Sequence, residues 1–106
     1  MALSHFTDDN FEQEVVQSTL PVMIDFFATW CGPCQQLAPI VEELASDYEG
    51  KVKIGKLDVD QANVTASKFQ VMSIPTIVFM KDGKVVDKAV GFMSKEALKE
   101  KLEAML

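Results

Sequence analysis

The stretch PVMIDFFATWCGPCQQLAPIVEELASDY, residues 21–48, changes its hydrophobic pattern in the middle. Residues 21–28 are almost continuously apolar, which is typical of a central strand covered on both faces. Residues 33–48 repeat apolar side chains at helical spacing, and Gly50 is placed to end this helix. Pro39 lies inside the helix and predicts a kink. We therefore expect a strand that leads directly into a helix, with two cysteines at the junction.

The segment after this helix extends the unit into an α/β pattern. Residues 51–60 alternate, with Val52, Ile54 and Lys56 on one face and Leu57 and Val59 on the other, which predicts a second strand. A strand, a helix and a strand in this order imply a right-handed parallel crossover. Both strands then end at the edge of the sheet where the cysteines lie.

Weaker signals place the remaining elements. Thr7, Asp8 and Asp9 supply capping oxygens for a first helix, and a short helix is expected at residues 64–69. Residues 76–80 and 84–90 flank an Asp-Gly pair, which predicts an antiparallel hairpin. Ser94 caps a last amphipathic helix. Because no linker or repeat divides the chain, we expect residues 1–106 to form one α/β domain.

The composition excludes some classes of partner. The chain has 106 residues and a formal net charge of −6, and all ten basic residues are lysine. Nucleic acid is not expected as a partner, because phosphate binding needs a basic face. A hydrophobic content of 48% with 25% charged residues fits a globular chain without a membrane span. The first ten residues lack a signal-peptide pattern, which predicts a cytoplasmic location; an organelle stroma or matrix stays open if a targeting segment has been removed.

The two cysteines allow three interpretations. As a staple, a Cys31–Cys34 bridge closes a very small loop and contributes only about 2 kcal/mol in the chain-entropy treatment. As a structural zinc site, the pair supplies half of the four ligands, and the only histidine, His5, is far away in sequence. We therefore expect no metal here. Redox chemistry explains more of the neighbouring residues.

A redox role follows from the position of the pair at a helix start. Cys31 is expected at the first helical position, where free N–H groups and the helix dipole stabilise a thiolate and lower the pKa of the thiol. Pro33 suits the first turn because its missing N–H is not needed there. Cys34 follows one turn later on the same side, so it can attack a mixed disulfide formed by Cys31.

The whole chain resembles the thioredoxins. The resemblance rests on DFFATWCGPC, APIVEELA with its internal proline, KLDVDQ, SIPT, KDGKVV and Gly91. It implies a central mixed sheet flanked by helices on both faces, an exposed nucleophile at Cys31 and a buried resolving thiol at Cys34. A lowered cysteine pKa is already known for thioredoxin itself, so the helix argument agrees with it and adds nothing independent. The expected partners are disulfide-containing proteins and a separate thioredoxin reductase, commonly a flavoprotein that draws on NADPH; the chain itself is expected to be a monomer without cofactor.

Asp25 has two interpretations. It can be a strand-end carboxylate that reaches water or pairs with Lys56. It can also be a buried acid behind the dithiol, with a raised pKa, that accepts a proton from Cys34. The resemblance favours the second interpretation, because the matching acid in the family assists thiol proton transfer and the lysine matching Lys56 lies nearby.

Substrate contacts are expected around the dithiol. Trp30 and SIPT taken singly fit simple packing, but in the family the bond matching Ile74-Pro75 is cis and lies against the cysteines. The Ile74 backbone would then hold a substrate strand by main-chain hydrogen bonds. The remaining methionines and phenylalanines, such as Met80 and Phe79, are expected in the core. The expected substrate-binding residues are Trp30, Gly32, Pro33, Val59, Ile74, Pro75, Val90 and Gly91.

Two departures from the common family pattern bear on partner preference. Gln35 stands where many relatives carry lysine, and Phe27 stands at a position that is often tryptophan. The sequence is consistent with three functions: a protein-disulfide reductase, an oxidase or isomerase of the same fold, and a binding module whose thiols are incidental. Pro33 favours the reductase, because oxidising relatives usually carry a different residue there.

Overall fold

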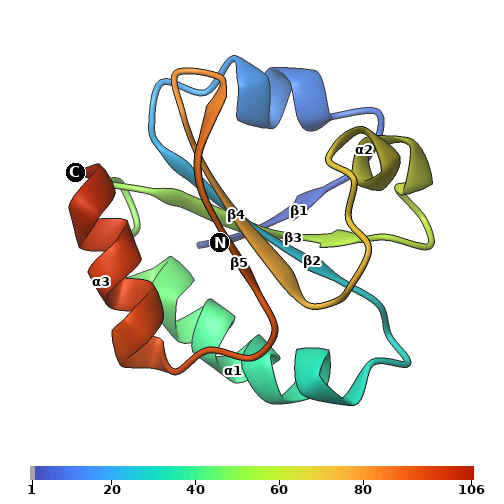
Figure 1. The fold of residues 1–106 in the computed structure, drawn as a ribbon. Coiled ribbons are helices and arrows are strands. Elements are labelled where there is room, and N and C mark those ends of the chain that lie inside the picture. Colours follow the sequence, from blue (N-terminus) through green and yellow to red (C-terminus); the bar gives the residue numbers. More distant parts are fainter. Residues whose placement is uncertain (1) are drawn as a thin grey trace.

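The computed structural model describes residues 2–106 and contains a five-stranded sheet between two helical layers (Figure 1). The strand order is β1-β3-β2-β4-β5. The first three strands in this order run parallel, and β4 is antiparallel to both β2 and β5, so the sheet is mixed as expected. The elements in chain order are β1 (Leu3–Phe6), η1 (Glu12–Val16), β2 (Val22–Phe27), α1 (Gly32–Asp47), β3 (Lys53–Asp58), α2 (Asn63–Lys68), β4 (Thr76–Lys81), β5 (Lys84–Val90) and α3 (Lys95–Met105).

The central strand β2 is covered on both faces, as its continuous apolar pattern predicts. Met23 packs in the core layer formed with α1 and α3, while Ile24 and Phe26 pack in the layer formed with η1 and α2. These three side chains have no exposed surface. Figure 1 shows the same division, with α1 and α3 on one side of the sheet and η1 and α2 on the other. Both helical layers therefore hold β2 in place, and with it the cysteine-bearing junction that follows.

The predicted strand-helix-strand unit is confirmed. β2 and β3 pair in parallel register, with Asp25 opposite Lys56 and Phe27 opposite Asp58, so both strands end at the same edge of the sheet. β3 is shorter than expected, because Val52 and Val59 lie just outside its paired residues. α1 ends at Asp47, and Gly50 takes a positive φ of 85° in the turn that follows.

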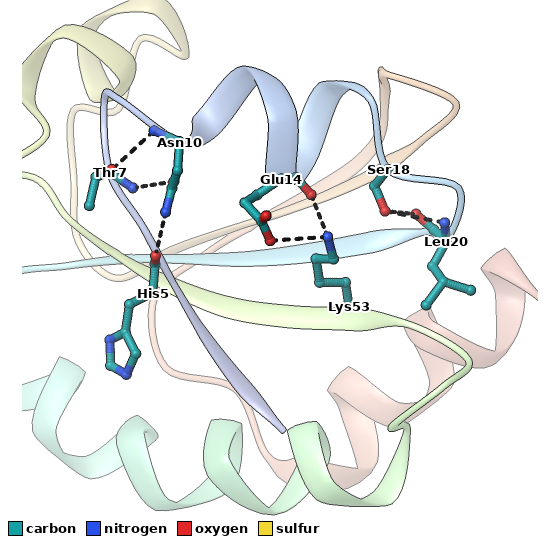
Figure 2. Close-up of polar contacts among 7 residues, drawn as sticks. All are labelled: His5, Thr7, Asn10, Glu14, Ser18, Leu20 and Lys53. Atoms are coloured by element: carbon teal, nitrogen blue, oxygen red, sulfur yellow. Dashed lines mark hydrogen bonds and ion pairs between the residues drawn. The ribbon is translucent and has the colours of Figure 1, made fainter. Parts of the chain in front are cut away.

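The first helix differs from the expectation. Only a short π-helix, η1, forms, and the reciprocal cap before it joins Thr7 to Asn10 rather than using Asp8 or Asp9 (Figure 2). The Thr7 N–H donates to Asn10 Oδ1 over 2.8 Å, and the Asn10 N–H donates to Thr7 Oγ1 over 3.1 Å. Figure 2 also shows Lys53 Nζ of β3 donating to the backbone oxygen of Glu14, 2.9 Å away. This contact ties η1 to the sheet.

Asp8 caps a different helix. Its Oδ1 accepts hydrogen bonds from the Thr65 N–H at 2.9 Å and from the Thr65 hydroxyl at 2.7 Å. These bonds from Thr65 hold the pKa of the Asp8 carboxyl below its usual range. Local spacing could not reveal this partner, because 57 residues separate the two in the chain.

The strand β1 was not expected from the sequence. It has only four residues, lies at the edge of the sheet and pairs with β3 alone. Its last residue, Phe6, is buried and packs over Gly55 of β3. A Cβ atom at position 55 would lie 2.5 Å from Phe6 Cε2 and 2.8 Å from the Ser4 carbonyl oxygen. The absence of a side chain at Gly55 is therefore what lets β1 dock.

We predict that Gly55→Ala destabilises the protein. The added methyl group must displace either an aromatic ring or strand backbone, and such overpacking costs about 1–3 kcal/mol of unfolding free energy. Denaturant titration measures this loss. Gly32→Ala is the matched control, because a Cβ at Gly32 would meet no atom within 4 Å. Equal midpoints for the two variants would contradict the proposed packing.

The C-terminal elements agree with their sequence signals. Asp82 and Gly83 both take positive φ, at 54° and 77°, in the turn between β4 and β5. The short helix expected at residues 64–69 is α2, and Ser94 caps α3 by accepting a hydrogen bond from the Ala97 N–H. Within residues 2–106, no helix has the length and apolarity needed to cross a membrane.

Candidate active site

Cys31 and Cys34 form a disulfide at the junction of β2 and α1. Cys31 is the N-cap residue of α1 and not its first helical residue as expected, because its φ and ψ of −89° and 113° are extended. Its Sγ accepts a hydrogen bond from the Cys34 N–H at 3.2 Å. The sulfur therefore occupies the position of a capping oxygen and faces the free N–H groups of the helix start.

Both cysteines are buried, with 5% of Cys31 and 4% of Cys34 exposed. The expectation of an exposed Cys31 is thus wrong for this disulfide form. The physical reason is packing: Ala28, Val59 and Ile74 lie against the bonded pair. In this form the bonded cysteines offer little surface to a partner.

The Ile74-Pro75 bond is cis, as the resemblance implied. The carbonyl oxygen of Ile74 lies 3.8 Å from Cys31 Sγ. The Gly91 N–H donates to the Pro75 carbonyl oxygen at 2.8 Å, which brings the end of β5 to the same place. Three segments that are far apart in the sequence therefore meet at the disulfide.

The expected substrate-binding residues surround this disulfide. Val59 and Ile74 are half-buried against it, and Val90 stands opposite Thr76 at the end of the β4–β5 ladder. Pro75 is buried and Gly91 is half-buried, so these two offer mainly backbone. The exposed members of the set are Trp30, Gly32, Pro33 and Val90.

Asp60 belongs to the site but was missed by sequence reasoning. Its Oδ2 accepts a hydrogen bond of 2.8 Å from Trp30 Nε1. Trp30 is 70% exposed, and this bond helps to orient its indole. One sequence signal could have revealed Asp60: it lies just after β3, at the edge of the sheet where β2 also ends.

Asp25 is fully buried on β2. Neither carboxylate oxygen has a hydrogen-bond partner among residues 2–106, so the interpretation of Asp25 as a solvated or ion-paired carboxylate is wrong. Desolvation raises its pKa to about 7, against a smaller opposing effect from the Lys56 charge. Side chains alternate along a strand, so Asp25 shares the face of Met23, which is the face covered by α1.

Lys56 lies beside Asp25 but makes no ion pair with it. It stands directly opposite Asp25 in the parallel β2–β3 register, and its Nζ lies 4.2 Å from the centroid of the Phe27 ring. This is a cation–π distance. Lys56 and Phe27 also line a cavity of about 210 Å³ that reaches Cys34. Lys56 and Cys34 therefore line the same solvent-accessible cavity.

The structure also places Gln35, Met72 and Phe92. Gln35 donates from Nε2 to the Thr29 carbonyl oxygen at 2.9 Å, so it braces the loop before the disulfide. Met72 and Phe92 are 94% and 49% exposed, which corrects the expectation that the remaining methionines and phenylalanines are core. Met80 and Phe79 do lie in the core.

The fold and this site define a thiol-disulfide oxidoreductase: a disulfide between cysteines three positions apart lies at the start of a helix that follows a central strand, and a cis-proline loop faces it. In the part of the chain that the structure describes, no three histidine, cysteine or acidic side chains gather as metal ligands.

Comparison with known proteins gives the family. A thioredoxin family model matches residues 2–104. The chain is 55% identical to the thioredoxins of Staphylococcus haemolyticus (strain JCSC1435) and Staphylococcus saprophyticus subsp. saprophyticus, and 53% identical to that of Staphylococcus aureus (strain Mu50 / ATCC 700699). Each of these alignments covers the full length of both chains. The chain belongs to the thioredoxin family.

Proposed function

We propose that the chain reduces disulfides in other proteins, with Cys31 as the nucleophile. The observation that carries this assignment is the Cys31 sulfur at the N-cap of α1, where it accepts the Cys34 N–H. In the reduced protein, a Cys31 thiolate would receive the same hydrogen bond. It attacks one sulfur of the substrate disulfide, so that a Cys31–substrate bond forms, the substrate S–S bond breaks and one substrate thiolate leaves.

Cys34 completes the exchange in this proposal. Its thiol loses a proton, attacks Cys31 Sγ and releases the second substrate thiolate, which leaves the Cys31–Cys34 disulfide. Asp25 is the proposed acceptor of that proton, since it is buried on the α1 face and its pKa of about 7 allows both protonation states near neutral pH. Lys56 is the proposed cation that stabilises the ionised carboxylate of Asp25.

The proposed substrate contact is an extended segment laid across the cis-proline loop. Ile74 offers backbone groups beside Cys31, and the exposed side chains of Trp30, Pro33 and Val90 offer an apolar rim. A thioredoxin reductase is the proposed electron source, because two electrons and two protons must return to the disulfide after each turnover. We further infer that residues 1–106 act as one domain, because all five strands share one sheet. We also propose that this domain works as a monomer in the cytoplasm.

Equilibration with glutathione buffers tests this assignment against an oxidase of the same fold. We expect the Cys31–Cys34 disulfide to form only in buffers more oxidising than about −240 mV, because a protein reductant must be at least as reducing as the glutathione pool. Alkylation of free thiols followed by mass spectrometry gives the reduced fraction at each potential. A midpoint near about −120 mV, typical of a strong oxidant, would overturn the proposal.

A further inference from the structure

Met72 is the most exposed large apolar side chain in the described part of the chain, with 94% of its surface in contact with solvent. The backbone on both sides of it is anchored. On one side the Val71 N–H donates to the Ala66 carbonyl oxygen at 3.1 Å, and the Val71 side chain packs on the core beneath η1 and α2. On the other side Ile74 packs against the disulfide. Met72 is therefore held outward by a fixed loop.

The position of Met72 links it to the reacting sulfur. Only Ser73 separates it from Ile74, whose carbonyl oxygen lies 3.8 Å from Cys31 Sγ. The hydrogen bond from the Gly91 N–H to Pro75 brings the neighbouring residue Phe92, which is 49% exposed, to the same loop. Met72 and Phe92 thus add exposed apolar surface next to the proposed substrate contact, at the loop that carries Ile74.

We propose that Met72 contacts the apolar residues that flank a substrate disulfide, and that oxidation of its thioether by a peroxide weakens this contact. The inference rests on the proposed function and deepens it, because it names the chemistry of the preferred substrate segment. A long, flexible, polarizable side chain suits contact with many apolar sequences. Burying such a side chain against a partner removes its apolar surface from water and strengthens binding.

The oxidation step balances with hydrogen peroxide as the oxidant. The Met72 sulfur gains one oxygen atom and loses two electrons, while the peroxide O–O bond breaks and water leaves. The resulting sulfoxide is polar, and methionine sulfoxide reductases reverse it. Exposure favours oxidation of Met72 over Met23, Met80 and Met105, which are 0%, 4% and 6% exposed.

Single-turnover reduction of two symmetrical disulfide peptides tests the contact. One peptide carries leucines beside its cysteine and the other carries serines. We expect Met72→Gln to reduce the leucine peptide about tenfold more slowly than the unaltered chain does, while the serine peptide changes less than about twofold. Met72→Leu keeps an apolar side chain and should retain the leucine-peptide rate. Val85→Gln is the control, since Val85 is 51% exposed and pairs with Met80, at the end of β5 away from Val90.

The outcomes separate this inference from the proposed function. Equal rates of the unaltered chain and Met72→Gln with the leucine peptide, in a chain that reduces both peptides, would overturn the role of Met72 alone. Failure of the unaltered chain to reduce either peptide would overturn the proposed function. An equal loss in Val85→Gln would show a general surface effect and would also overturn the inference.

Peroxide treatment of the disulfide form tests the modification, with peptide mass spectrometry as the readout. We expect Met72 to convert to sulfoxide about tenfold faster than Met23, Met80 and Met105, because oxidation follows exposure. The oxidised protein, after reduction of its disulfide, should lose the leucine-peptide rate as Met72→Gln does. Peroxide-treated Met72→Leu should keep it. Equal oxidation at all four methionines, or an unchanged rate after selective oxidation of Met72, would overturn the proposal.

Discussion

Replacing Cys31 with serine is expected to lower the rate of disulfide reduction by at least about 10⁴-fold, the scale seen when an enzyme loses its nucleophile. The sulfur of Cys31 occupies the N-cap of α1 and receives the Cys34 N–H, which is a site for a thiolate. A serine hydroxyl at the same place stays protonated near neutral pH and cannot open a disulfide. Single-turnover reduction of a disulfide peptide at pH 7 measures the loss.

Cys34→Ser is the matched variant, because it removes the other sulfur of the same pair. It should keep the first attack and fail at the second, so that a covalent adduct of the protein with one half of the peptide accumulates. Intact-mass measurement detects this adduct, and added dithiothreitol should release it. An adduct that forms with Cys31→Ser but not with Cys34→Ser would reverse the assigned roles, and no adduct with either variant would favour a binding module with incidental thiols.

The strand-helix junction could be predicted because its signals are local. An unbroken apolar run before the cysteines requires cover on both faces, and the helical spacing after them requires one covered face. β1 carried no comparable signal, since Phe6 is the one buried residue among its four at the edge of the sheet. Its docking depends on the bare backbone of Gly55, which lies on another strand. Asp8 likewise found its partner at Thr65, beyond the reach of capping patterns.

The active site also has features that could be predicted from the sequence and features that could not. The spacing of the cysteines and the proline between them identified the redox pair, but the contact between Trp30 and Asp60 spans 30 residues and needs the fold. The burial of Cys31 in the disulfide form depends on packing by Val59 and Ile74, which lie far from it in the sequence. Composition suggested core for Met72, whereas the anchored loop holds it in solvent. Local chemistry was thus predictable, and the surroundings that set substrate preference were not.

Asp25→Ala is expected to stabilise the fold at pH 8. Burial raises the pKa of the Asp25 carboxyl from 3.8 to about 7, so folding disfavours its ionised form. Between these two pKa values the folded state binds the proton and the unfolded state has lost it, so stability falls as pH rises from about 4 to 7. Above pH 7 both states are ionised and the full penalty, about 4 kcal/mol, persists. A small cavity in the variant offsets part of the gain.

Denaturant titrations from pH 4 to 8 measure this difference. The gain of Asp25→Ala over the unaltered chain should grow through this range and level off above pH 7. A control at Asp87 separates the buried charge from charge in general, because hydrogen bonding from Lys101 lowers the pKa of that partly exposed carboxyl. Asp87→Ala should therefore show no gain that grows with pH. A gain of the same size at pH 4 and pH 8 for Asp25→Ala would contradict the titration argument.

The same Asp25→Ala variant should exchange disulfides more slowly while being more stable. Without the buried acceptor the Cys34 proton must leave to water through the cavity that Cys34 and Lys56 line, and loss of a positioned base costs at least about tenfold in rate. Single-turnover decay of the mixed disulfide at pH 7 measures that step apart from the first attack. Stability and rate must therefore change in opposite directions, because one buried carboxyl, without a hydrogen-bond partner among residues 2–106, causes both effects. A destabilised variant with an unchanged rate would assign Asp25 a packing role only.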